Sequence, residues 1–365
     1  MILQCTKKLL EYLGGNTRKD EEATEPLFTW SANLITLNRR KTLVAVNAAS
    51  RCVVVLHGLR AANRPRIGEL LREAIRIQLE QAYVRSDMID QYLSDCGETL
   101  SYAANTSRST IAYCSKACKT VSLFSDLLEP EDMFQKKLLP KFNDDVLPNS
   151  NYRTNGEEMI ALLRERYGRE PLSCQAVELE VELELTTPCT RTLLIPTDRD
   201  FYQLHRILQN AFGWEDRHLH EFILEEGSFG RPEKVVTLTE ELEDVLEGIV
   251  YLDSLQTTLK DVFPKYESIL YVYDFGDEWV HRIRLKRLVE DCPTPYPQCL
   301  AAEGDAPMED CGGPAGFDRV CQILADPKHP EYKEIRSWVG SNGWKRLNLE
   351  EIQRRVRFNF GYFDW

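Results

Sequence analysis

Three histidines and several aspartates in the second half of the chain are the residues best suited to chemistry. His218 and His220 are separated by one residue, so on an extended strand their side chains share a face. His281 and Asp277 are likewise spaced to share the inward face of another strand. Imidazole and carboxylate groups bind divalent metals, and histidine titrates near neutral pH. These residues can therefore hold a metal ion or serve in general acid–base catalysis.

A structural role is the alternative for the same residues. Buried histidines and hairpin aspartates commonly satisfy backbone groups, and tryptophans among them usually pack. We therefore expect a scaffold role first, a cleft for a peptide, nucleic acid or small ligand second, and metal or catalytic chemistry third. The residues of the candidate cleft are Trp214, Asp216, His218, His220, Asp274, Asp277, Trp279 and His281. The sequence contains no nucleophile elbow, phosphate-binding loop or dinucleotide fingerprint.

Two charged strands are expected to position this cleft. From Val177 to Leu185, aliphatic residues alternate with four glutamates, which places all the carboxylates on one face of a strand. Between His281 and Lys286, basic residues alternate with the histidine and two aliphatic residues. Four like charges on one face need compensation. We therefore expect the two strands to be sheet neighbours whose opposite charges pair across the solvent face.

A helix is expected beside these strands, over 198–211. Thr197 can cap it, and Asp200 stands three residues later in the capping-box position. Its apolar stripe carries His205, which we expect to be a satisfied core or boundary histidine.

Further strands are expected at 218–224 and 269–273. The second joins the strand that begins at Trp279 through a tight hairpin over 274–277, where Gly276 can take the positive φ that such a turn needs. The pattern predicts a mostly antiparallel sheet covered by helices on one face.

The first region of the chain is typical of an antiparallel meander followed by helices. Strands are expected at 33–37, 42–46 and 51–56, with short turns between them. Apolar residues at helical spacing then predict a helix around 67–75, and Ser86 can cap another.

A polar stretch separates the two halves. Residues 141–155 are rich in turn-forming residues and lack apolar periodicity, which is typical of an interdomain linker. A helix is expected after it, over 157–166. We therefore predict an α+β protein with two domains, each a mostly antiparallel sheet with helices packed on one face. The predicted divisions are a domain at 1–140, a linker and connecting helix at 141–172, and a domain at 173–365.

The second domain, from about residue 175 to 365, resembles the plasmid pRiA4b ORF-3-like family. The resemblance rests on motif residues in four segments: 214–222, 271–281, 309–317 and 326–338. It implies a shared fold. It also implies a link to plasmids and mobile elements, where some members are labelled transposon passenger proteins.

The first 130 residues or so resemble the DUF6933 family, a family of unknown function. The residues that carry the resemblance include Trp30, Ala32 and Asn33, the run from Asn38 to Lys41, and Val46 with Asn47. This resemblance implies a fold unit and no activity.

Charge and cysteine usage narrow the setting. The formal net charge of −13, from 45 basic and 58 acidic residues, argues against nucleic-acid binding through overall charge. Short basic clusters at 39–41 and 354–357 leave a local DNA contact open. An odd number of scattered cysteines, eleven in all, favours reduced thiols. No apolar run is long enough to span a bilayer and no secretory signal is evident, so we expect a cytoplasmic protein without a membrane partner.

These observations favour a bacterial, non-catalytic binding or interaction module linked to plasmids or mobile elements. One alternative is a metal-dependent enzyme that uses the His/Asp cluster. Another is a DNA-associated transposon passenger protein. A protein or nucleic-acid partner is compatible with the sequence, which leaves the cofactor, the metal and the oligomeric state unassigned.

Overall fold

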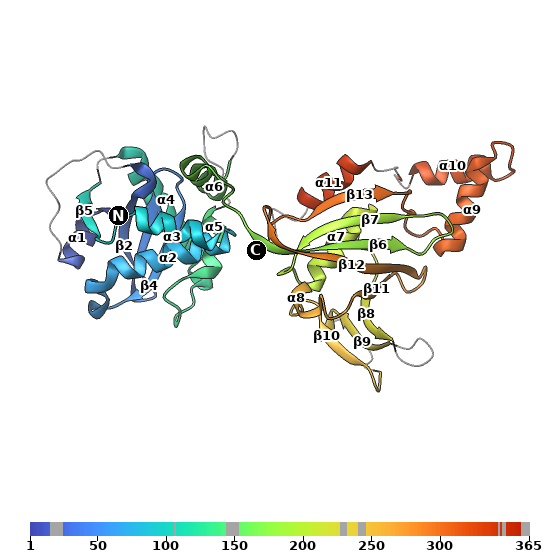
Figure 1. Ribbon diagram of the computed structural model, residues 1–365, viewed down its shortest axis with the longest axis horizontal. Coiled ribbons are helices and arrows are strands. Elements are labelled where there is room, and N and C mark those ends of the chain that lie inside the picture. The colour runs from blue at the N-terminus through green and yellow to red at the C-terminus, as the bar shows by residue number, and fades with distance from the viewer. Residues whose placement is uncertain are drawn as a thin grey trace. The chain divides into compact units, whose positions relative to one another are not determined.

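The chain folds into two compact units, Met1–Ser173 and Cys174–Trp365, in the computed structural model of Figure 1. The structure describes residues 1–14, 25–105, 107–143, 153–226, 232–239, 246–341, 344 and 348–358. Each unit contains one sheet with helices packed against it, which confirms the predicted α+β class with two domains. The two are described separately below as the N-terminal and the C-terminal unit.

The sheet of the N-terminal unit has five strands in the order β4-β3-β2-β1-β5. Their bounds are Ile2–Cys5 for β1, Thr29–Leu37 for β2, Arg40–Asn47 for β3, Val53–Leu59 for β4 and Ser101–Ala104 for β5. Strands β2, β3 and β4 form the predicted antiparallel meander. Strand β1 differs, because it lies between β2 and β5 and runs parallel to both. The helix α1 (Lys7–Leu13) supplies the crossover that a parallel connection needs.

Helices cover both faces of this sheet, whereas the residue pattern predicted helices on one face only. Helices α2 (Ile67–Gln81) and α3 (Ser86–Asp95) share a core with Leu43 and Val54, whereas α4 (Arg108–Leu123) packs against Val44. The reason lies in β3 and β4, which carry apolar residues on both faces, as strands buried on both sides do. Short helices complete the unit: α5 spans Pro140–Asn143, and 3₁₀ turns occupy Pro26–Phe28, Ala61–Arg66, Ser125–Leu127 and Lys136–Leu138.

The helix expected over 157–166 is α6 (Asn155–Tyr167). Thr154 caps it, and Glu157 completes a capping box by accepting from the backbone N–H of Thr154. Met159, on the inner face of α6, is buried in the core of the N-terminal unit. Residues 144–152 of the expected linker lie outside the described residues.

The C-terminal unit is built on an eight-stranded sheet in the order β10-β9-β8-β11-β12-β6-β7-β13. The strand bounds are Cys174–Leu183 for β6, Thr190–Pro196 for β7, His220–Glu226 for β8, Pro232–Thr237 for β9, Val250–Asp253 for β10, Ser268–Tyr273 for β11, Trp279–Cys292 for β12 and Gln298–Glu303 for β13. Every neighbouring pair is antiparallel except β9 with β10.

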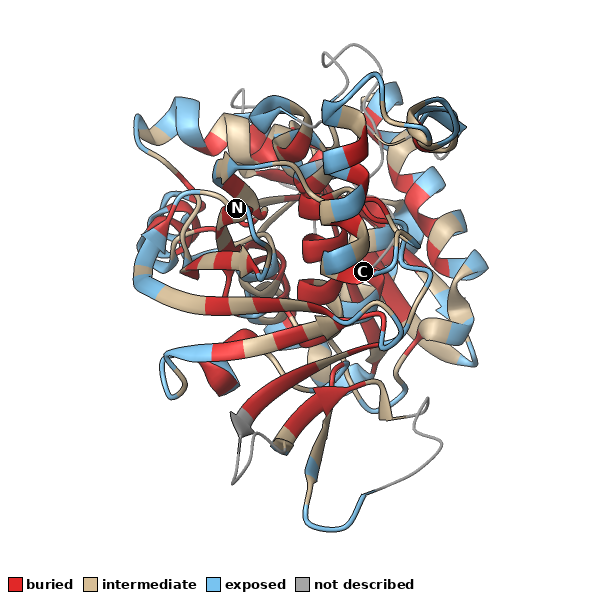
Figure 2. Ribbon diagram, turned by 90° about the vertical axis from the view of Figure 1, so that its right-hand side faces the viewer, coloured by how far each residue is buried: buried red, intermediate tan, exposed pale blue. Residues whose placement is uncertain are grey.

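The core of this unit lies between the sheet and the helices on one of its faces (Figure 1). These helices are α7 (Phe201–Phe212), α8 (Leu259–Val262), α9 (Gly313–Ala325), α10 (Tyr332–Ser341) and α11 (Leu349–Phe358). Figure 2 shows the resulting alternation, with buried and partly exposed residues following one another along the strands nearest the viewer. On β6, for example, Leu179 and Val181 are fully buried while Glu180 between them is not.

The predicted pairing of the glutamate-bearing and arginine-bearing strands is confirmed. Strands β6 and β12 are antiparallel neighbours, with Arg284 opposite Glu180 and Arg282 opposite Glu182. Each basic side chain of this charge ladder reaches a glutamate. The pairs are Arg282 with Glu184 at 3.0 Å, Arg284 with Glu182 at 2.7 Å, Lys286 with Glu180 at 3.4 Å and Arg287 with Glu178 at 2.7 Å.

Helix α7 begins three residues later than expected. Its N-cap is Asp200 and not Thr197, because the Asp200 carboxylate accepts from the backbone N–H of Gln203 at 2.7 Å. The Gln203 side chain in turn accepts from the backbone N–H of Asp200 at 3.1 Å, which closes the capping box.

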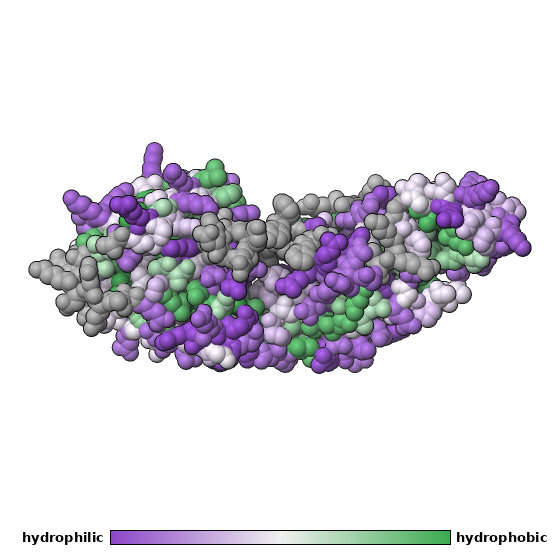
Figure 3. Space-filling view, turned by 90° about the horizontal axis from the view of Figure 1, so that it is seen from above, coloured by the Kyte–Doolittle hydropathy of each residue, from purple (hydrophilic) through white to green (hydrophobic). Residues whose placement is uncertain are grey.

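All eleven cysteines have free thiols. No helix in the described ranges is long and apolar enough to cross a membrane. On the side of the molecule shown in Figure 3, hydrophilic residues predominate and hydrophobic ones form small separate areas.

Candidate functional site

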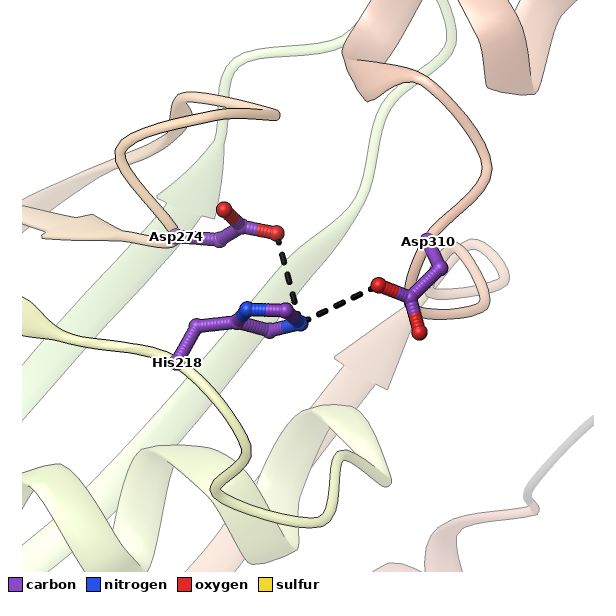
Figure 4. Close-up of side chains that lie close together, drawn as sticks. All are labelled: His218, Asp274 and Asp310. Carbon is purple, nitrogen blue, oxygen red and sulfur yellow. Dashed lines mark ion pairs between the residues drawn. The ribbon is translucent and has the colours of Figure 1, made fainter.

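Three segments that are distant in sequence meet at one end of the C-terminal sheet (Figure 4). The first is the loop 214–219, between α7 and β8. The second is the turn 274–278, between β11 and β12. The third is the segment 309–312, which leads into α9. All three belong to the motif segments 214–222, 271–281 and 309–317, so these motif residues are neighbours in space.

Each segment contributes one polar side chain to a common point. The Nε2 atom of His218 lies 3.2 Å from Oδ1 of Asp310 and 3.5 Å from Oδ2 of Asp274. One ligand atom from each residue lies within 4.8 Å of the others, and no other group of His, Cys, Asp or Glu side chains in the described part of the chain meets this condition. Asp274 is nearly buried, His218 is partly exposed and Asp310 is open to solvent. The three residues, called the His/Asp triad below, therefore converge on one point, with Asp310 on the solvent side and the Nε2 atom of His218 buried.

The turn 274–278 fixes the carboxylate of Asp274. Oδ1 accepts from the backbone N–H groups of Gly276 and Asp277, at 2.9 and 3.3 Å, which leaves Oδ2 for His218. The positive φ angles of this turn occur at Asp274 and Glu278. The expectation that Gly276 takes a positive φ was wrong. A Cβ at this position would make a tight contact, 3.2 Å from the Asp274 carboxylate oxygen.

The segment 309–312 is held against the other two segments. The Glu309 carboxylate accepts from the hydroxyl of Tyr273 at 2.5 Å and from the backbone N–H of Glu215 at 3.1 Å. The Gly312 N–H donates to the Asp277 carboxylate at 3.1 Å. These bonds lie on either side of Asp310 and fix its backbone next to His218.

A buried network holds the loop 214–219 from the inside. His205 on α7 is fully buried, and its Nε2 lies 2.7 Å from the Asp216 carboxylate. Its Nδ1 lies 2.8 Å from the Tyr271 hydroxyl, which also accepts from Gln209 at 3.1 Å. The Gln209 side-chain oxygen accepts from the backbone N–H of Asp216 at 2.9 Å, so the network closes on itself. In the tautomer with the proton on Nε2, that nitrogen donates to Asp216 and Nδ1 accepts from the Tyr271 hydroxyl, so each polar atom named here has a partner.

This carboxylate–histidine–hydroxyl chain has the order of a catalytic relay, yet it points into the core. Tyr271 is fully buried, and burial raises the pKa of its hydroxyl well above the usual value. A relay needs a nucleophile that meets substrate. The hydrogen bond from His205 lowers the pKa of Asp216 and so keeps that carboxylate ionised. The geometry thus assigns the chain to positioning the loop that carries His218.

The three predicted histidines occupy different surroundings. His218 precedes β8, which begins at His220, so the two do not share a strand face as expected. His220 is stacked on His205 with 3.5 Å between ring centroids. His281 is fully buried beside Trp214 and Phe212. Burial lowers the pKa of both His220 and His281 to about 3, so these two rings are neutral.

The remaining predicted residues have structural contacts. Trp214 is buried and its indole N–H donates to the Pro307 carbonyl at 2.9 Å. Trp279 is fully buried beneath it, with ring centroids 5.9 Å apart. Asp277 binds the backbone of the segment 309–312, as described above. Of the predicted cleft, the structure brings His218 and Asp274 together at the triad, and Asp216 and Asp277 support them.

Sequence reasoning missed Asp310, the third member of the triad, and the supporting residue Glu309. Both lie in the motif segment 309–317, so the residues themselves are evident from the sequence. Their position was not, because the segment is irregular and its path depends on two consecutive residues with left-handed backbone, Gly312 and Gly313. His205 was correctly placed in the core, but its polar partners were not foreseen.

Models of two protein families match the chain, one on each unit. A model of the plasmid pRiA4b ORF-3-like protein family matches residues 175–354, and a model of the domain of unknown function DUF6933 matches residues 2–158. Through its C-terminal unit the chain belongs to the plasmid pRiA4b ORF-3-like family.

Two further proteins each match about half of the chain. The uncharacterized protein y4hQ of Sinorhizobium fredii is 35% identical over 185 residues, which cover 49% of this chain and 90% of that protein. A crystal structure of MM3350, a protein of unknown function from Methanosarcina mazei Go1, shows 26% identity and a TM-score of 0.42. That match covers 48% of this chain and 96% of MM3350.

Proposed function

We propose that the C-terminal unit is a binding module that holds a divalent metal ion at the His/Asp triad and uses it to bind a protein partner. The observation that carries this proposal is the convergence of His218, Asp274 and Asp310 within 4.8 Å. A metal ion bound between these three groups would be coordinated by all of them. Its positive charge would also offset the repulsion between the two carboxylates.

The ligand set selects among metals. One imidazole nitrogen with two carboxylate oxygens suits borderline ions such as Zn²⁺, Mn²⁺, Fe²⁺ or Co²⁺, whereas Ca²⁺ and Mg²⁺ prefer oxygen ligands alone. Three protein ligands leave at least one coordination position open, because even tetrahedral zinc takes four. That position is available to a side chain of a partner, since Asp310 lies at the solvent surface.

The charges around the triad favour a protein over a nucleic acid. The residues beside it include the exposed carboxylates of Glu215 and Glu278. The neighbouring Arg217 is paired with Glu215 and also lies 3.9 Å from the Asp310 carboxylate. An acidic surface repels the phosphate backbone and attracts basic side chains. The basic cluster at 39–41 is likewise engaged locally, because Arg40 pairs with Glu131 at 3.6 Å. The setting of a plasmid or mobile element rests on the family's name alone and is part of the proposal.

The direct test is metal binding by the full-length protein. Calorimetric titration with Zn²⁺ and Mn²⁺ is expected to give one site per chain. His218→Ala, Asp274→Asn and Asp310→Asn are each expected to weaken it at least about tenfold, because even the loss of a residue that only supports a ligand costs about 10–100-fold. His329→Ala and Asp126→Asn, outside the triad, serve as matched controls and keep the affinity. Failure of the wild type to bind either ion, or equal binding by the triad variants, contradicts the proposal.

A second function, a metal-dependent enzyme, is favoured by the open coordination position. Cobalt-loaded protein can distinguish the binding module from the enzyme. A change in its visible spectrum on adding imidazole would show that the open coordination position is accessible. Turnover of activated phosphate and carboxylate esters that is lost in the triad variants would favour the enzyme. Spectral change without turnover favours the binding module.

A further inference from the structure

Two cysteines face each other across neighbouring strands of the C-terminal unit, away from the triad. Cys174 is the first residue of β6 and Cys292 is the last residue of β12. They are opposite each other in the antiparallel register, just past an irregularity between Val289 and Cys292. Residues in such a position have Cα atoms roughly 4.5–5.5 Å apart, which lies within the roughly 4.4–6.8 Å that a disulfide spans.

Their side chains point to the same place. The Sγ atom of Cys174 lies 3.2 Å from the carbonyl oxygen of Thr294, and the Sγ atom of Cys292 lies 3.4 Å from that same oxygen. Cys174 Sγ also lies 3.7 Å from the carbonyl oxygen of Cys292. Both thiols are therefore on one side of the two strands and can meet after rotation about their Cα–Cβ bonds.

We propose that Cys174 and Cys292 form a modification site at which a low-molecular-weight disulfide converts the two thiols into a disulfide between β6 and β12. The proposal is independent of the function proposed for the triad. It concerns a site where the structure places two reduced sulfurs in register and within reach of solvent on one side.

Exposure sets the order of the two steps. Cys174 is partly exposed, so its thiolate attacks the small disulfide, forms a mixed disulfide and releases one small thiol. Cys292 is 1% exposed and reacts second: its thiolate attacks the Cys174 sulfur and releases the second small thiol. The two cysteines lose two electrons and two protons in all, and the small disulfide is reduced to two thiols. Burial raises the pKa of Cys174 to about 12, so the reaction is slow at neutral pH and speeds up as the pH rises.

The disulfide would join residues 118 positions apart in the sequence. It would link the start of β6 to the end of β12, the two strands that the charge ladder also connects. Long loops closed by a native-geometry disulfide resist unfolding most. The oxidised protein is therefore expected to show a higher Tm for the C-terminal unit than the reduced protein.

The experiment treats the full-length protein with hydroxyethyl disulfide at neutral and at mildly alkaline pH, blocks remaining thiols, and maps peptides without reduction. A linked peptide pair containing Cys174 and Cys292, formed faster at the higher pH and absent in Cys174→Ser and Cys292→Ser, is the expected result. Cys114→Ser with Cys118→Ser, a neighbouring thiol pair on α4, is the matched control and keeps the linkage. A stable adduct on Cys174 without linkage, linkage of either cysteine elsewhere, or two unmodified thiols in the wild type each overturns the proposal, whether or not the serine variants fold.

Discussion

His205 holds Asp216 from inside the core, with its Nε2 atom 2.7 Å from the carboxylate although the histidine itself is completely buried. The loop 214–219, which carries His218, is thus hydrogen-bonded to helix α7 through His205. The same histidine is stacked on His220 with 4° between the ring planes. Loop, helix and strand are joined at this one imidazole.

Asp216→Asn tests that anchor. We expect a loss of about 1–2 kcal/mol in the free energy of unfolding, because a charge-assisted hydrogen bond becomes a neutral one and solvent screens the half-exposed carboxylate. Metal affinity is expected to fall as well, since His218 loses its support. Urea unfolding and calorimetric titration measure the two effects. Glu215→Gln, a surface carboxylate of the same loop, is the control and stays within about 0.5 kcal/mol.

His281 predicts how stability depends on pH. Burial lowers its pKa in the folded protein to about 3, below the usual histidine value of 6.5, so the unfolded chain binds the proton more readily between these values. Its contribution is therefore present above about pH 6.5 and is lost as the pH falls toward about 3, at roughly 1.4 kcal/mol per pH unit. His281→Phe is expected to flatten the pH dependence of unfolding by that amount. Parallel curves for the two proteins would show that His281 does not titrate in this way.

The close approach of Gly313, at the start of α9, to the turn 274–278 can be tested by substitution. A Cβ at Gly313 would lie 2.5 Å from the carbonyl oxygen of Asp277, and φ is +68°. Gly313→Ala is expected to cost more than about 1 kcal/mol of unfolding free energy and to weaken metal binding by displacing Asp310. Gly248→Ala, with φ +90° and open space, controls for backbone strain, and Gly340→Ala, with neither problem, for the mutation itself. Equal effects of Gly313→Ala and Gly248→Ala would rule out the close contact as the cause.

Arg284 predicts the energetics of the charge ladder. It lies 2.7 Å from Glu182 and 3.7 Å from Glu180, with the side chains about half exposed. Arg284→Glu is expected to destabilise the C-terminal unit by about 1 kcal/mol at low salt, and less at high salt, because like charges then face each other. Adding Glu182→Arg is expected to restore part of the loss. Unfolding at several salt concentrations checks both statements, and a salt-independent loss would point to packing instead.

The sequence predicted the fold best where one periodicity governed a whole strand. The alternation from Val177 to Leu185 determined which side of β6 is buried and which partner could neutralise it, and the register confirmed both. The same rule failed at His218, because this residue lies two positions before β8 begins and period-two alternation does not apply there. Faces are shared only where the backbone is extended.

The triad itself depends on loop geometry, which residue spacing does not encode. Asp310 reaches His218 because Glu309 and Gly312 bind two other segments, and these are contacts between residues far apart in the chain. His205 shows the complementary limit. Helical periodicity placed it on the inner face of α7, but its partners Asp216 and Tyr271 come from a loop and a strand.

The charge ladder also bears on how the C-terminal unit behaves in a crowded solution. On the outer face of β6 and β12 every basic side chain of the ladder already has an acidic partner, as in the pair of Arg287 with Glu178. If another sheet stacked on this face, these ion pairs would be desolvated without gaining new partners, at a cost of several kcal/mol per ion. The ion pairs therefore disfavour self-association of the protein through this face of the sheet.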